Sequence, residues 1–259
     1  MNYSTAIQSK KKQSVYTAIT IVLLVLCVST ATVMLYLRDS NKTVSEIENI
    51  KNETTVSQSL VQLKPDSIPE FSGNDYVVLN GNIPLFTESD SDLINGEYYS
   101  PLDSLGRCGV VYAQIDQTMM PTAEREAIGM IKPSGWQTIK YPEVISDLYL
   151  YNRCHLIAYA FTGQNANEQN LITGTRYMNV SGMLPFEKQV IDYLEETDNH
   201  VLYRVTPFFK GNELVARGVE MEALSVEDGG DSLCFHVFVY NYQPGIEIDY
   251  MTGDSRLKN

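Results

Sequence analysis

The hydrophobic and polar positions divide the chain into three parts. Residues 15–37 carry no charge and are rich in Ile, Val and Leu. Residues 38–69 are mainly polar, and aromatic and β-branched residues become frequent only from about residue 68. The pattern predicts an apolar segment, then a polar stalk or linker over 38–69, and a folded domain over 70–259. A short amphipathic helix and a flexible tether both remain open for the stalk.

The apolar segment is long enough to cross a membrane. At ~1.5 Å per residue it covers about 34 Å, against ~30 Å for a hydrocarbon core. A cleavable secretory signal, which would release a secreted form, is the alternative, but no small-residue cleavage site follows the segment. Lys10, Lys11 and Lys12 precede it. The positive-inside rule therefore predicts a cytoplasmic N-terminus over 1–14, a transmembrane anchor over 15–37 and an extracellular domain.

Within the predicted domain, runs of β-branched and aromatic residues indicate strands, and glycine-containing turns indicate hairpins. The expected strands are Tyr76–Leu79, Gly109–Ile115, Val201–Phe209, Glu213–Ala223 and Leu233–Tyr242. Turns at 210–212 and 228–230 are expected to join two hairpins. One helix is predicted from about Leu184 to Glu196, with Phe186, Val190, Tyr193 and Leu194 on one face. The fold class is therefore α+β with an antiparallel sheet.

Charge and cysteine content limit the function. The chain has 19 Lys and Arg against 32 Asp and Glu, a net charge of −13. Its first 38 residues contain no acidic residue, so all the acidic residues lie in the part that is predicted to be extracellular. Because Lys and Arg supply most of the affinity for phosphate, a nucleic-acid enzyme of this composition must gather its basic residues locally and use a metal cation. Cys108, Cys154 and Cys234 are scattered singly, which is not the pattern of a disulfide framework. Buried free thiols are favoured, and a single bridge that leaves one thiol unpaired is the alternative.

Residues suited to chemistry concentrate in two segments and one helix. The first segment reads Tyr-Asn-Arg-Cys-His-Leu-Ile over 151–157, and the second runs from Asn170 through Arg176 to Asn179. Glu187 follows inside the predicted helix. A neutral histidine, with a reference pKa of ~6.5, can take a proton from water near neutral pH. Asparagine and glutamate supply the oxygen ligands that Mg²⁺ prefers.

In these segments the chain resembles the DNA/RNA non-specific endonucleases of the ββα-metal, or His-Me finger, superfamily, in particular those at or beyond the surface of Gram-positive bacteria. The resemblance covers about residues 70–252. It also includes Leu-Gly-Arg at 105–107, Lys-Pro-Ser-Gly-Trp at 132–136, Met-Leu-Pro-Phe-Glu at 183–187 and Tyr-Arg-Val-Thr-Pro at 203–207. It implies that the sheet is accompanied by a ββα-metal motif.

The resemblance also implies roles for individual residues. His155 is expected to be the general base and Asn179 the ligand of one Mg²⁺, for which Mn²⁺ is a substitute. Asn170, Glu187 and Arg125 correspond to the family's other catalytic residues, with Glu187 near a metal-bound water and Arg125 on a phosphate.

Further basic residues are candidates for substrate binding, and two positions depart from the family's usual Asp-Arg-Gly-His. Arg153, Arg107 and Arg176 are the substrate-binding candidates. Asn152 stands in place of the usual Asp and Cys154 in place of the usual Gly. Asparagine keeps a hydrogen-bonding oxygen but loses the charge. His200, His236 and Trp136 are expected to be structural.

These observations predict a Mg²⁺-dependent, sequence-non-specific endonuclease that hydrolyses DNA, and RNA as a second substrate, outside the cell. The alternative is a surface module that keeps the nuclease fold and binds nucleic acid without cutting it, because of Asn152, Cys154 and the acidic surface. A zinc hydrolase is a third, weaker hypothesis, since the three histidines show no paired ligand spacing.

Overall fold

A computed structural model describes residues 68–87, 90 and 96–258. The predicted cytoplasmic N-terminus, the transmembrane anchor with Cys27, and the stalk up to residue 67 lie outside the described residues. Among the helices that are described, none has the length and apolar character needed to cross a membrane.

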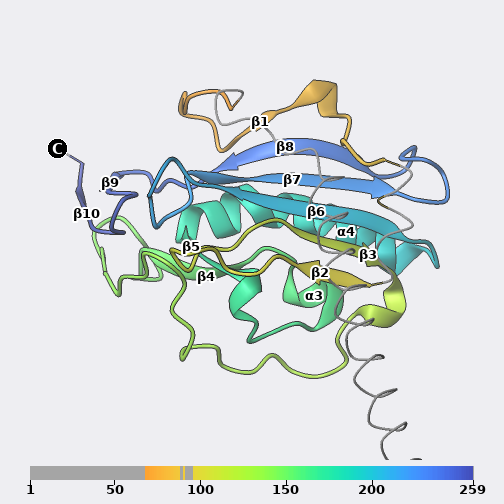
Figure 1. Cartoon of the computed structure of the whole chain (residues 1–259), viewed down its shortest axis with the longest axis horizontal. Coiled ribbons are helices and arrows are strands. Elements are labelled where there is room, and N and C mark those ends of the chain that lie inside the picture. The colour runs from red at the N-terminus through yellow and green to blue at the C-terminus, as the bar shows by residue number, and fades with distance from the viewer. Residues whose placement is uncertain (1–67, 88–89, 91–95, 259) are drawn as a thin grey trace, which may run out of the picture. The chain divides into compact units, whose positions relative to one another are not determined.

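Six antiparallel strands form the main sheet, in the order β1-β8-β7-β6-β3-β2 (Figure 1). Their bounds are β1 Tyr76–Val78, β2 Glu97–Tyr99, β3 Val111–Ile115, β6 Val201–Phe208, β7 Gly218–Ser225 and β8 Cys234–Tyr240. The two expected hairpins are confirmed, since β6 pairs with β7 and β7 with β8. The prediction of a mixed fold with an antiparallel sheet is also confirmed.

One expected strand begins later than predicted. The run from Glu213 was expected to be extended, but β7 starts only at Gly218. The backbone N–H groups of Leu214 and Val215 donate instead to the carbonyl of Tyr250, at 3.0 and 2.9 Å. The C-terminal segment therefore takes the hydrogen bonds that a longer β7 would have made.

Helix α4, Leu184–Glu196, covers one face of the sheet and lies behind it in Figure 1. Its buried side chains are those predicted, namely Phe186, Val190, Tyr193 and Leu194. They pack into one core with alternate residues of the strands, such as Val111, Tyr203, Met221 and Val237. The period of two in the strands and of 3.6 in the helix explains why both patterns were readable from the sequence.

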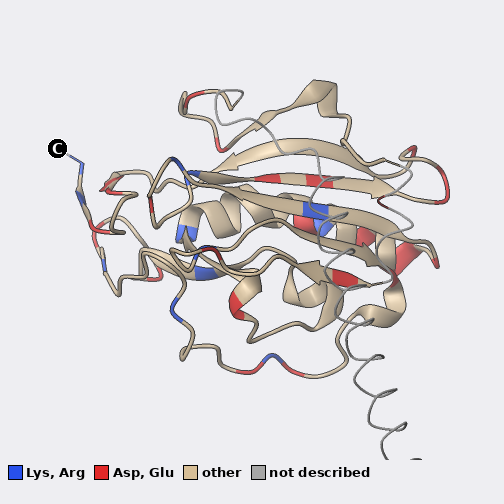
Figure 2. Cartoon of the chain, in the orientation of Figure 1, with Lys and Arg blue, Asp and Glu red and all other residues tan. Residues whose placement is uncertain are grey.

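The opposite face of the sheet buries charge. Arg204 on β6 donates from Nε to Glu222 Oε2 on β7 at 2.6 Å, and both side chains are 1% exposed. His236 on β8 contacts Glu220 Oε1 through Nε2 at 2.6 Å and the carbonyl of Ile83 through Nδ1 at 2.9 Å. In Figure 2 the acidic positions of β7 and the basic position of β6 lie side by side. These groups fasten the segment that follows β1 to the sheet.

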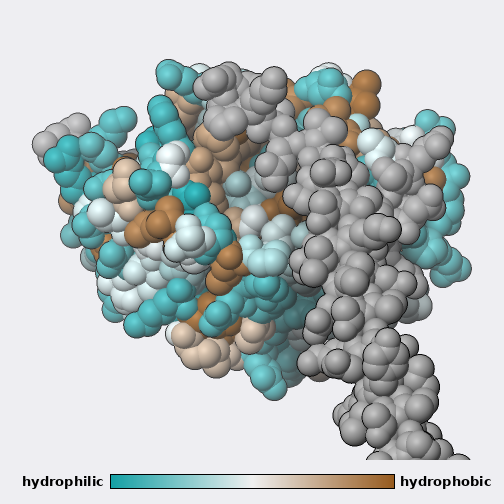
Figure 3. Space-filling model, in the orientation of Figure 1, coloured by the Kyte–Doolittle hydropathy of each residue, from teal (hydrophilic) through white to brown (hydrophobic). Residues whose placement is uncertain are grey.

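The remaining elements are short. They comprise α3 Tyr159–Thr162, β4 Tyr151–His155, β5 Leu171–Thr175, β9 Ile246–Ile248, β10 Ser255–Leu257, the 3₁₀ turns η2 Asn80–Asn82, η3 Gln117–Met119 and η4 Glu168–Asn170, and the π-helix η5 Met178–Met183. Strand β4 pairs with β5, and β9 with β10. Polar and apolar residues intermix over the described part of the face in Figure 3.

Cysteine chemistry follows the expectation. Cys108 and Cys154 are buried, Cys234 is partly exposed, and all three are free thiols. Burial raises the pKa of Cys108 to about 12, which keeps that thiol protonated and unreactive.

Candidate active site

Strands β4 and β5, the π-helix η5 and helix α4 build the site. Strand β4 pairs antiparallel with β5, with Asn152 opposite Gly174 and His155 opposite Leu171. The chain then passes through the π-helix η5 into α4. His155 ends β4, Asn179 lies in η5 and Glu187 in the first turn of α4. This strand-strand-helix order brings together residues separated by 32 positions in sequence.

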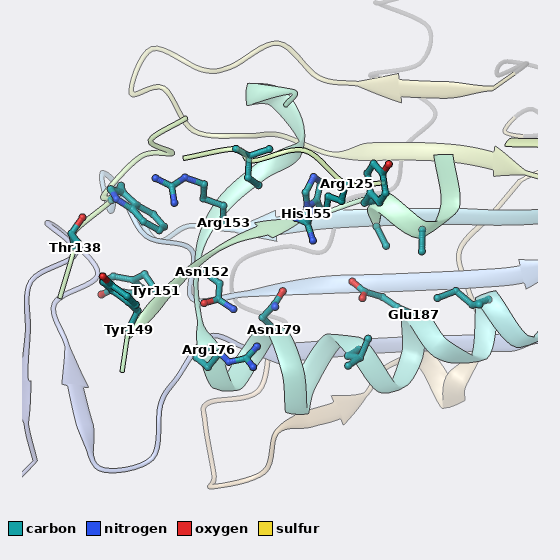
Figure 4. Close-up of a pocket in the computed structure, with 17 residues that line it drawn as sticks. Arg125, Thr138, Tyr149, Tyr151, Asn152, Arg153, His155, Arg176, Asn179 and Glu187 are labelled. Carbon is teal, nitrogen blue, oxygen red and sulfur yellow. Dashed lines mark hydrogen bonds between the residues drawn. The ribbon is translucent and has the colours of Figure 1, made fainter. Parts of the chain in front are cut away.

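These residues line one pocket of about 780 Å³. Figure 4 shows Asn152, Asn179 and Glu187 along one side of it and His155 and Arg125 across from them. Of the eight residues predicted for the site, six line the pocket: Arg125, Arg153, His155, Arg176, Asn179 and Glu187. A π-helical turn at Asn179 agrees with the frequent use of such turns at functional sites.

His155 is held in one tautomer. Its Nε2 lies 2.9 Å from the backbone carbonyl oxygen of Asn165, which can only accept, so Nε2 carries the proton. Its Nδ1 lies 3.0 Å from Nη2 of Arg125, which can only donate, so Nδ1 offers its lone pair. The proton-accepting nitrogen is therefore Nδ1.

The surroundings of His155 favour the neutral ring. The residue is 7% exposed. Burial, assisted by the charge of Arg125, lowers its pKa to about 4, although the hydrogen bonds to the backbone at Asn165 and Gln164 act in the opposite direction. A ring that stays neutral above pH 5 is available as a base throughout the neutral range.

Asn165 links the histidine to the arginine, and sequence reasoning missed it. Besides the carbonyl contact to His155, its Oδ1 accepts from Arg125 Nε at 3.4 Å, and its Nδ2 donates to the carbonyl of Glu126 at 2.9 Å. Because the contact to His155 is made by a backbone atom, no residue type at this position signals it.

Asn152, Asn179 and Glu187 present oxygen atoms to the pocket. Their side chains form no hydrogen bond with any described residue. Burial raises the pKa of Glu187 to about 7, against the opposing charge of Arg125. A set of uncommitted amide and carboxylate oxygens fits a hard divalent cation.

The other basic residues of the pocket are already engaged. Arg153 donates to the carbonyls of Ile131 and Gly129, at 2.5 and 2.9 Å, and its guanidinium lies 4.0 Å from the Trp136 ring centroid. Arg176 pairs with Asp147, whose side chain is 55% exposed. Arg153 thus braces the pocket wall, whereas the exposed pair of Arg176 can exchange for a phosphate.

The chain matches a family of known proteins. A sequence model described as DNA/RNA non-specific endonuclease matches residues 88–227, more than half of the chain. The chain belongs to the DNA/RNA non-specific endonuclease family.

Two of the proteins to which the chain is similar are streptococcal. A deoxyribonuclease of Streptococcus dysgalactiae subsp. equisimilis is 36% identical over 110 residues, a match that spans 40% of this chain and only 32% of that protein. The magnesium-bound NucA structure from Streptococcus agalactiae has a TM-score of 0.60 at 28% identity and covers 70% of this chain and 86% of NucA. The zinc-bound Sda1 nuclease structure gives 0.54 at 30% identity, covering 63% and 81%.

Two residues predicted for the endonuclease site lie outside the pocket. Asn170 is fully buried, where its Oδ1 accepts from the N–H of Ile157 at 2.8 Å and its Nδ2 donates to the carbonyl of Ile157 at 2.9 Å. Asn170 therefore fixes the chain just after His155 and does not face the pocket. Arg107 donates to Asp103 Oδ2 at 2.7 Å and to the carbonyl of Gly211 at 2.8 Å, in a different part of the surface.

The two departures from the family's usual motif differ in position. Cys154 is fully buried in the core, and a Cβ placed on Gly174 would come within 2.3 Å of its Sγ. The larger side chain is thus accommodated beneath Gly174 and away from the pocket. Asn152, in contrast, lines the pocket, so the missing carboxylate is a change in the site itself.

The histidines expected to be structural lie outside the pocket. His200 pairs with Glu227 at 2.6 Å near the surface. His236, Glu220 and Glu222 lie close enough together to hold a metal ion. However, Glu222 is already bound by Arg204, and Glu220 is bound by His236. Trp136 packs against a core cluster, as expected, and one side of it also lines the pocket.

Proposed function

We propose that this family member is a Mg²⁺-dependent, sequence-non-specific endonuclease that hydrolyses phosphodiester bonds of DNA, and RNA as a second substrate. The observation that carries the proposal is the fixed tautomer of His155 in a pocket with uncommitted oxygen ligands. The solved NucA structure with magnesium and the Sda1 structure with zinc support a metal-dependent activity of this kind.

His155 is the general base. A phosphodiester entering the pocket competes for Arg125, because a guanidinium binds an anionic phosphate more strongly than a neutral imidazole. Release of Arg125 leaves the Nδ1 lone pair free to accept a proton from water while the water oxygen attacks phosphorus. The bond from phosphorus to the leaving oxygen breaks, and that oxygen takes its proton from solvent. General-base assistance of this type is worth roughly 10²–10⁴-fold in rate.

Asn179 would hold the metal, with Glu187 accepting from a metal-bound water and Asn152 beside them. When bound, Mg²⁺ supplies charge stabilisation for the pentacoordinate transition state and for the leaving oxygen. Because Asn179 is neutral, little of that charge is cancelled by its ligand.

Arg125 and Arg176 provide the local positive charge that an acidic protein needs in order to bind nucleic acid. Both line the pocket. Their position answers the objection from the net charge of −13, since phosphate affinity depends on the groups that contact it.

The apolar segment at residues 15–37 and the three lysines before it support an extracellular placement of the domain, anchored in the cell membrane. Protease added to intact cells should then remove the domain, and protection until the membrane is broken would contradict this orientation.

A cleavage assay tests the proposal. The full-length chain is incubated with plasmid, single-stranded DNA and RNA in the presence of Mg²⁺, Mn²⁺ or EDTA. Cleavage with either ion and none with EDTA is the expected result. Binding without cleavage under every condition would instead support the module that only binds nucleic acid, for which the uncharged Asn152 in the pocket is the favouring observation.

A further inference from the structure

The catalytic pocket continues past the reacting groups into an aromatic end. Trp136, Thr138, Tyr149 and Tyr151 line this end, and Figure 4 shows Tyr149 and Tyr151 apart from His155 and Glu187. The inference drawn from this end rests on the proposed nuclease function and concerns the substrate that the site selects.

Among these three aromatic residues, Tyr149 has the most accessible ring. Tyr149 is 43% exposed, whereas Tyr151 is 3% exposed and donates its hydroxyl to the carbonyl of Gly253. Trp136 is partly buried and packs against a core cluster. Tyr149 is therefore the aromatic side chain at this end of the pocket best placed to receive a ligand.

The backbone next to Tyr149 is in a strained conformation. Leu148 has a φ of 71°, a conformation that a bulky residue rarely adopts. Its carbonyl accepts from the N–H of Tyr141 at 2.8 Å, and its neighbour Asp147 pairs with Arg176 of the pocket. Backbone strain of this kind persists where the surrounding structure enforces it, often at functional sites.

Positive charge surrounds the same ring. Lys140 Nζ lies 4.7 Å from the Tyr149 ring centroid. Arg153 and Arg176 also line the pocket, and in Figure 4 they lie between Tyr149 and the catalytic groups. Aromatic rings that stack on bases, combined with cations that follow the backbone, are how proteins bind single-stranded nucleic acid.

Contact between Tyr149 and a nucleobase favours the same class of substrate. His155 is only 7% exposed, so the phosphodiester must enter the pocket to reach it, and the neighbouring nucleobase then comes near Tyr149. A single strand can turn that nucleobase outward onto the ring, whereas a nucleobase paired in a duplex must first be unstacked, at a cost of a few kcal/mol.

We propose that Tyr149 stacks on a nucleobase next to the scissile phosphodiester and that the site thereby selects single-stranded nucleic acid. The stacked nucleobase fixes the register of the strand, so that the adjacent phosphate lies against Arg125 and Nδ1 of His155. The recognition is independent of sequence, because every base has a face that can stack.

Oligonucleotides with one cleavable bond test the role of Tyr149. In short single-stranded DNA, every linkage is a methylphosphonate except one phosphodiester, and a tetrahydrofuran abasic residue is placed on its 5′ or its 3′ side. With Mg²⁺, wild-type enzyme should lose about 10-fold in kcat/KM for one of the two abasic positions, as expected for one stacked base.

Three variants separate stacking from folding. Tyr149→Phe keeps the ring, so an abasic residue should reduce its kcat/KM as it does in the wild type. Tyr149→Ala and Tyr149→Leu, the second of which keeps an apolar side chain of similar size, should have a kcat/KM about 10-fold lower on the intact substrate. The abasic residue should not reduce their kcat/KM any further. An equal abasic penalty in wild type and Tyr149→Leu, with both proteins folded by circular dichroism, would overturn the assignment.

A duplex of the same sequence tests the substrate class. The wild type should cleave the single strand at least about 10-fold faster than the duplex, and Tyr149→Leu should reduce that preference. Equal rates on both, unchanged by the variant, would overturn the proposed selection. Cleavage of the intact single strand by the wild type shows that the nuclease function holds in either case.

Discussion

The buried His155 should make the protein less stable in acid, and a single substitution should remove that effect. The perturbation is His155→Gln, which keeps polar groups at the site but cannot take up a proton near neutral pH. In the folded protein burial lowers the pKa of His155 to about 4, while an unfolded chain should show about 6.5. The unfolded state therefore binds the proton first as the pH falls.

The sign and size follow from this difference. Stability linked to His155 is fully present above about pH 6.5 and is lost progressively as the pH falls toward about 4. At about 1.4 kcal/mol for each pH unit, the loss amounts to about 3 kcal/mol. His155 is 7% exposed, so solvent screening reduces the figure little.

Urea unfolding at pH 7 and pH 4, in EDTA, measures the effect. Between pH 7 and pH 4, the free energy of unfolding should fall by about 3 kcal/mol more in the wild type than in His155→Gln. His236 titrates in both proteins, so its contribution cancels in the comparison. Its hydrogen bond to Glu220 and the charges of Glu222 and Glu220 outweigh burial and raise its pKa. An equal loss in the two proteins would refute the view that His155 is kept neutral.

Three further substitutions have defined outcomes. Asn179→Ala should raise the Mg²⁺ concentration for half-maximal cleavage by about 10-fold or more. An unchanged Mg²⁺ titration would show that Asn179 is not a metal ligand. Arg125→Ala should raise KM for all sequences alike and reduce the slope of log KM against log salt by about one phosphate contact, whereas a loss limited to one sequence would indicate base readout. Glu222→Gln should weaken the buried pair with Arg204 and cost up to about 3–5 kcal/mol in urea unfolding, with the cleavage rate of folded protein unchanged because the pair lies across the sheet from α4.

The main sheet and its helix could be predicted because their patterns are local. The bounds of α4 and its buried face agree with the prediction, and the strands from Val201 onward follow runs of β-branched and aromatic residues. Strands β4 and β5 were not marked by such runs. They were expected only from the resemblance to the endonuclease family, which implied a strand-strand-helix motif around His155.

Sequence analysis could bring candidate residues together where a side chain carries the chemistry. His155, Asn179 and Glu187 line the same pocket, as expected. Asn170 could not be placed, because an asparagine that clamps a buried backbone and one that faces a substrate look alike in sequence. Asn165 acts on His155 through its carbonyl, which every residue has.

The accessible aromatic residue was also beyond sequence analysis. Tyr149 and Tyr151 are alike in type and two positions apart, yet they are 43% and 3% exposed. Tyr149 follows a residue with positive φ, Leu148, whereas Tyr151 begins the paired strand β4, and both features follow from tertiary structure.

Single-turnover cleavage by His155→Ala tests the central claim most directly. Wild type and variant are compared on single-stranded DNA with saturating Mg²⁺, with binding measured separately by fluorescence anisotropy in EDTA. The variant should bind as the wild type does and cleave roughly 10²–10⁴-fold more slowly, with part of the rate restored by added imidazole. A folded His155→Ala protein that cleaves at the wild-type rate would contradict the assignment of His155 as the general base.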